Sequence, residues 1–148
     1  MGLDNGFILT NKKTKTKLEL GYFRNFYELD RWVRENGKVE NGKVDRNFCY
    51  EFILDKEILK KLLEEITPIA EKLLKFGDNK VSYYDSYGYP QEFIETFYRE
   101  YFNPASSDSA FAGEKLIDLY YKVKTMYDLY DINDNMDEDW ILTFYSSF

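Results

Sequence analysis

Six carboxylates lie within a short stretch near the end of the chain, with no basic residue among them. They are Asp128, Asp131, Asp134, Asp137, Glu138 and Asp139. Calcium is the first chemistry to consider, and Asp131, Asn133 and Asn135 match the first three ligand positions of an EF-hand loop. Met136 replaces the turn glycine, however, and Leu142 replaces the bidentate glutamate. The segment therefore favours a solvated acidic loop or a partner-facing patch, and we expect no metal or other cofactor.

A second candidate surface is rich in tyrosine. Tyr83, Tyr84, Asp85, Tyr87 and Tyr89 fall in one loop-like stretch together with serine and glycine. Large rigid aromatic side chains mixed with small polar residues give a large contact area at a low cost in side-chain entropy, which is why antibody paratopes use them. The alternative is a tyrosine-lined turn that packs on its own domain. We expect both this loop and the acidic run to face a protein partner.

Histidine is absent, and this limits the chemistry of the chain. Ser-His-Asp and Cys-His catalysis and Cys/His zinc sites are excluded. A pair of carboxylates drawn from Glu92, Glu95, Glu100 and Asp108 would suffice for a hydrolase, although the sequence does not give their separation. The near match to a phosphate-binding loop at residues 37–43 is followed by Val44, which lacks the hydroxyl that holds magnesium. We therefore expect a protein that is not an enzyme.

A small-ligand site is the alternative. Arg24 would meet a phosphate, and Tyr22 or Trp32 would stack on a base, with Asn25 beside them. Such a set would suit a signalling nucleotide. The plainer interpretation makes Arg24 one half of a surface ion pair at a strand-helix junction.

Charge is distributed unevenly along the chain. Residues 1–80 carry 16 basic and 14 acidic groups, whereas residues 81–148 carry 4 and 13. A negative field of this kind repels nucleic acid and favours a basic partner surface. The single cysteine and the absence of a signal peptide or a long apolar run lead us to expect a cytoplasmic protein that does not enter a membrane.

Periodicity predicts one α+β domain over residues 1–148. Residues 6–10 and 18–23 alternate as a hairpin, and residues 48–54 and 140–145 have the aromatic and β-branched content of strands. Helical spacing covers residues 26–36, 58–76, 90–102 and 112–130, with a break or kink expected near Pro68. We therefore expect a small antiparallel or mixed sheet of about four strands, packed against about four helices on one face.

Short motifs resemble a group of small bacteriophage and prophage proteins that begin Met-Gly-Leu-Asp. The chain has Met1-Gly2-Leu3-Asp4, then Tyr22-Phe23-Arg24-Asn25 where the group shows Tyr-Trp-Arg-Lys, then Trp32-Val33. Cys49 opens a strand as in the group, and Phe144-Tyr145-Ser146-Ser147-Phe148 is similar to its aromatic ending. The resemblance implies a phage or mobile-element accessory protein and supplies no activity.

An inhibitor of a host defence protein follows as the leading hypothesis. Host defence nucleases have basic nucleic-acid channels, and an acidic surface could fill one, as an anti-CRISPR protein would. The expected partner is thus a host protein that handles nucleic acid, and the protein itself is not expected to bind nucleic acid. The nucleotide-binding protein and the carboxylate hydrolase remain alternatives.

Overall fold

The computed structural model describes residues 2–39, 49–75, 112–133 and 135–147, and it opens with the predicted hairpin. Strand β1 (Asp4–Asn11) pairs antiparallel with β2 (Lys17–Arg24), so that Asp4 lies opposite Arg24. The Asn11 side chain holds the turn, because its Oδ1 accepts hydrogen bonds from the backbone N–H groups of Lys13 and Thr14, both at 3.0 Å. Residues 12–16, which contain three lysines, therefore form the turn of the predicted hairpin.

The last strand lies in the middle of the sheet. Strand β5 (Trp140–Ser147) pairs with β1 on one side and with β4 (Cys49–Ile53) on the other. The two-residue strand β3 (Lys38–Val39) extends the edge beyond β4. The strand order is β2-β1-β5-β4-β3, and every pairing among the described strands is antiparallel.

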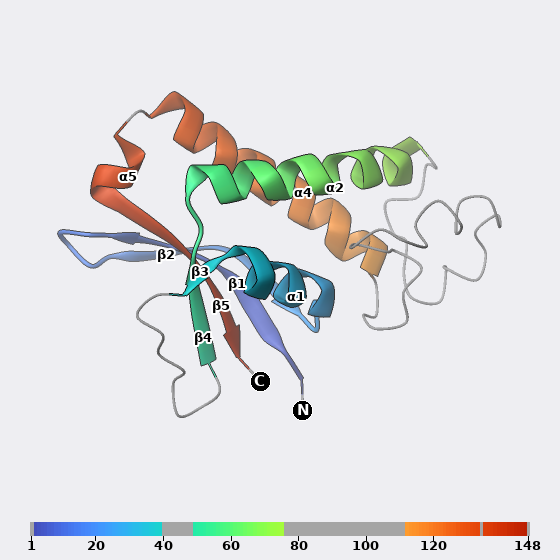
Figure 1. Cartoon of the computed structure of the whole chain (residues 1–148), viewed down its shortest axis with the longest axis horizontal. Helices are drawn as coiled ribbons and strands as arrows, with labels where there is room; N and C mark the ends of the chain where they lie inside the picture. Colours follow the sequence, from blue (N-terminus) through green and yellow to red (C-terminus); the bar gives the residue numbers. More distant parts are fainter. Residues whose placement is uncertain (1, 40–48, 76–111, 134, 148) are drawn as a thin grey trace.

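Three longer helices lie over one face of this sheet (Figure 1). They are α1 (Tyr27–Asn36), α2 (Lys56–Lys75) and α4 (Ala112–Ile132). Helix α2 runs on through Pro68 without a break, because Ile66, Ala70 and Leu73 on either side of the proline are buried and hold the helix against the core. The predicted α+β class is confirmed, while the expected helix at residues 90–102 lies outside the described residues.

A short helix, α5 (Met136–Asp139), joins α4 to β5. The sequence predicted an acidic loop here, and the structure corrects this: four residues form a helical turn. Local hydrogen bonds close that turn, with Met136 N donating to Asn133 O and Glu138 N to Asn135 O, both at 3.1 Å.

One hydrophobic core joins the helices to the inner face of the sheet. Along β1, Phe7 and Leu9 are buried against the helices, whereas Ile8 and Thr10 point to the opposite face and are half-buried. Phe7 meets Phe144 of β5 edge to face, with ring centroids 5.6 Å apart. No helix in the described part of the chain is long and apolar enough to cross a membrane.

Candidate functional site

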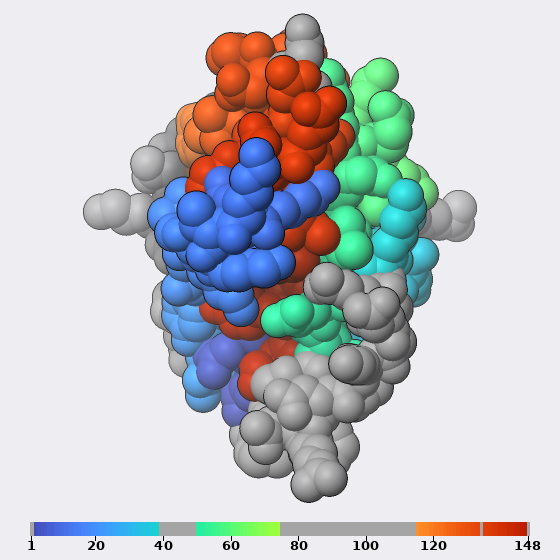
Figure 2. All heavy atoms as spheres, turned by 90° about the vertical axis from the view of Figure 1, so that its left-hand side faces the viewer, coloured from blue at the N-terminus to red at the C-terminus, as the bar shows by residue number. Residues whose placement is uncertain are grey.

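Most of the described acidic residues from the sequence prediction gather at one end of the molecule. Asp128 and Asp131 lie on the last turns of α4, and Asp137, Glu138 and Asp139 form most of α5. All five are exposed. Figure 2 faces this end and shows the hairpin turn, in blue, directly beside the orange and red surface of α4 and α5.

Cations of the same chain neutralise only part of this acidic end. Lys56 Nζ lies 3.2 Å from Asp131 Oδ1. Lys12 binds main-chain oxygens instead, since its Nζ donates to Asp137 O and its backbone N–H donates to Asp139 O at 2.8 Å. Within the described part of the chain, the carboxylates of Asp128, Asp137, Glu138 and Asp139 form no ion pair.

The polarity of α4 adds to the negative charge. Its last turn contains no basic residue, and its C-terminal end leads into α5 through a short connection. The C-terminus of a helix carries a partial negative charge that stabilises a nearby cation. The carboxylates and the C-terminal end of α4 therefore both make the local potential more negative, and the surface favours a cationic partner.

Metal-ligating side chains do not form a cluster in the described part of the acidic end. Among residues 2–39, 49–75, 112–133 and 135–147, no three metal-ligating side chains come together. Asp134, the remaining carboxylate of the acidic run, lies outside that range. The five described carboxylates lie on the last turns of α4 and on α5.

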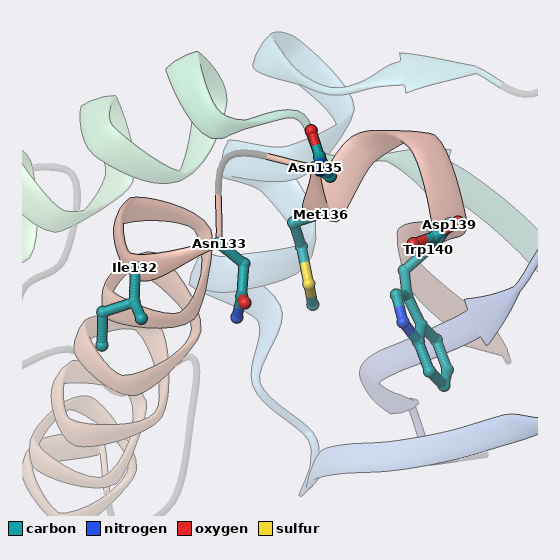
Figure 3. A pocket seen from close by; sticks show the side chains of 6 residues that line it. All are labelled: Ile132, Asn133, Asn135, Met136, Asp139 and Trp140. Atoms are coloured by element: carbon teal, nitrogen blue, oxygen red, sulfur yellow. The ribbon is translucent and has the colours of Figure 1, made fainter.

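A hollow of about 330 Å³ lies between the end of α4 and the start of β5. Figure 3 shows the side chains of Asn133, Met136 and Trp140 pointing to the same side, with Met136 between the other two. Among the described residues, Ile132, Asn135 and Asp139 also line the hollow. Ile132 is 78% exposed, while Met136 and Trp140 are half-buried and rest on the core. The acidic end thus contains a concave site whose lining is mostly polar, with Met136, Trp140 and Ile132 contributing its smaller apolar part.

The residues proposed for a nucleotide site do not assemble into one. Tyr22 and Arg24 lie on the sheet face away from the helices, where both contact Asp4: Tyr22 Oη donates to Asp4 Oδ1 at 2.6 Å and Arg24 Nη1 at 2.9 Å. The hydrogen bond to Asp4 raises the pKa of Tyr22, and the same pair of donors lowers the pKa of Asp4. An anionic ligand at Arg24 would meet the Asp4 carboxylate.

The other two residues of that set serve the fold. Asn25 has a positive φ of 58° and exchanges hydrogen bonds with Leu3, donating its N–H to Leu3 O at 2.7 Å and accepting from Leu3 N at 2.8 Å. Trp32 is 1% exposed, and its indole N–H donates to Glu65. A ring buried in the core is not available to stack on a base.

Several predicted site residues lie outside the described residues. These are the tyrosine loop, with Tyr83, Tyr84, Asp85, Tyr87 and Tyr89, and the carboxylates Glu92, Glu95, Glu100 and Asp108. The structure does not test either prediction.

Sequence reasoning missed the apolar part of the hollow. Trp140 was assigned to a strand, and Met136 served only to argue against calcium. One signal was present, because Ile132, Met136 and Trp140 recur every four residues beside the carboxylates. The chain passes from α4 through α5 to β5 over these residues, so helical spacing alone does not predict that their side chains share one face.

Comparison with known proteins gives no match, whether with protein-family models, with curated proteins or with solved structures. We therefore infer function from the residues and geometry of this chain.

Proposed function

We propose that this chain is a non-enzymatic binding protein whose acidic end engages a basic surface of another protein. The observation that carries the proposal is the cluster of exposed carboxylates around the hollow, four of which form no ion pair within the described part of the chain. Complementary charge raises the rate of association and helps to select the partner.

The partner that fits best is a host protein that handles nucleic acid. Its basic channel presents lysine and arginine side chains spaced to meet phosphates, and an acidic protein surface can take the place of those phosphates. The resemblance to small phage proteins supports an anti-defence role, for example as an anti-CRISPR inhibitor. No described feature favours the nucleotide-binding or hydrolase alternatives.

Affinity capture from lysate of the native host tests this proposal. The lysate is first treated with nuclease, so that nucleic acid cannot bridge the two proteins. We expect the immobilised protein to retain a nucleic-acid-handling protein at about 0.1 M salt and to release it near 1 M, because the Debye length falls from about 10 Å to about 3 Å. Retention of no such protein, or retention that salt does not weaken, would count against the proposal.

A further inference from the structure

We propose that the hollow between α4 and β5 receives the side chain of one arginine of the partner, an inference that rests on the proposed function. The hollow lies within the acidic end and combines an indole, a thioether and a carboxylate in its lining. Each of these groups matches a different part of an arginine side chain.

Size restricts the occupant. The volume of about 330 Å³ is at the lower limit of the roughly 300–1,000 Å³ of small-ligand pockets. A site of this size accepts one long side chain with its water molecules. It does not accept a folded element of the partner.

The smaller, apolar part of the lining matches the stem and the plane of an arginine. Trp140 and Met136 point into the same space in Figure 3. An indole face attracts a cation placed over it, and a methionine side chain adapts its shape to its neighbours. Ile132, at 78% exposure, has apolar surface that a methylene stem can cover.

The charged groups match the guanidinium. Asp139 lines the hollow, and its carboxylate forms no ion pair within the described residues. Lys12 reaches this region, yet its hydrogen bonds go to the main-chain oxygens of Asp137 and Asp139. No cation of the described residues pairs with the Asp139 carboxylate, which leaves it open to a cation of the partner.

Arginine fits this combination better than lysine. A guanidinium is planar, stacks on an aromatic ring and presents paired donors to a carboxylate, whereas an ammonium is a compact and strongly hydrated point charge. The presence of both an indole and a carboxylate in one hollow distinguishes the two cations, which a purely acidic surface would not do.

Two N-acetylated peptides of equal length and charge, one of arginine and one of lysine, test the inference on the full chain at low salt. We expect the arginine peptide to bind about threefold tighter or better. It should also change the fluorescence of Trp140, since Trp32, the other tryptophan, is 1% exposed. Equal affinities, or no binding of either peptide, would overturn the arginine assignment.

Two variants with the same change of charge test whether the preference for arginine depends on the hollow. Asp139→Asn removes the carboxylate that lines the hollow, and Glu138→Gln removes its exposed neighbour on the same short helix. We expect Asp139→Asn to abolish the preference for arginine and Glu138→Gln to weaken both peptides alike. Equal effects of the two variants would contradict the assignment. Trp140→Leu, checked for folding by circular dichroism, should also abolish the preference.

The outcomes separate this inference from the proposed function. Capture of a host protein without an arginine preference would support the acidic end as the binding surface and disprove the arginine site. An arginine preference without capture of a host protein would support the arginine site in the hollow and disprove the proposed function.

Discussion

The Asp4 carboxylate binds the side chains of both Arg24 and Tyr22. Its carboxylate accepts hydrogen bonds from both side chains, and all three groups are exposed enough for water to screen them. A surface ion pair of this kind contributes little to stability. Its effect is on specificity, because it places a negative charge where a phosphate would otherwise meet the guanidinium.

Gly6 in β1 has no room for a side chain. A Cβ there would lie 2.1 Å from the main-chain oxygen of Gly21 and 3.0 Å from the ring of Tyr145. The first neighbour is backbone and cannot move without disturbing the pairing of β1 with β2. We therefore expect Gly6→Ala to lower the free energy of unfolding by about 2–3 kcal/mol, measured by urea denaturation.

Gly21→Ala is the matched control for that variant. Its new Cβ would meet the Lys122 side chain at 2.9 Å and Phe7 at 3.4 Å. A lysine methylene group can rotate away, so we expect a cost of less than about 1 kcal/mol. If Gly6→Ala proved as mild as Gly21→Ala, the close approach of β1 and β2 at this point would be disproved.

At the scale of elements, Asp55 fixes where α2 begins. Its Oδ1 accepts a hydrogen bond from the Ile58 N–H at 2.9 Å, and its Oδ2 accepts one from Lys38 Nζ at 2.7 Å. Asp55 is therefore the N-cap of α2. We expect Asp55→Ala to cost about 1 kcal/mol of unfolding free energy, and Asp55→Asn to cost less because asparagine also caps helices well.

The same residue gives a prediction for pH. Burial alone would raise the pKa of Asp55, but the hydrogen bonds from Lys38 and Ile58 lower it below the ordinary value of 3.8. A carboxyl whose pKa is lowered by folding stabilises the protein above its unfolded pKa and loses that effect as the pH falls. The difference between wild type and Asp55→Ala should therefore be full at pH 7 and shrink below pH 3.8. A difference that stays constant across this range would rule out the ionised cap.

The longer elements were predictable, and the short ones were not. Apolar residues repeat at helical spacing in α1 and α2, and the hairpin has alternating strands around a polar turn. Helix α5 spans four residues and buries none of them, so it produces no periodic signal. It is held in part by a tertiary contact, the hydrogen bond from the Lys12 N–H to Asp139 O.

At the scale of the whole molecule, the sheet brings together distant parts of the chain. The central position of β5 depends on pairings such as Asp4 with Ser147, which no local pattern specifies. The acidic residues were predictable as a cluster because they are close in sequence. The contact of that cluster with Lys12 was not, because it spans 125 positions.

The two ends of the sheet differ in character. Residues from two of the motifs compared above with phage proteins lie beside Asp4, from the first motif, where β1 begins, since Asp4 lies opposite both Arg24 and Ser147. The acidic end adjoins the opposite end of β1, where Asn11 pairs with Trp140. These motif residues therefore lie at one end of the sheet, and the binding surface that we propose lies at the other.

The most direct test of this account compares two variants with the same net charge in the capture experiment. One variant neutralises the acidic end, with Asp128→Asn, Asp137→Asn and Glu138→Gln. The other neutralises exposed carboxylates on α1 and α2, with Glu35→Gln, Glu64→Gln and Glu71→Gln. We expect the first variant to lose about tenfold or more of the retained partner, since interfacial charges act locally, and the second to retain it nearly as wild type does. Equal retention by the two variants would contradict the assignment of the acidic end as the binding surface.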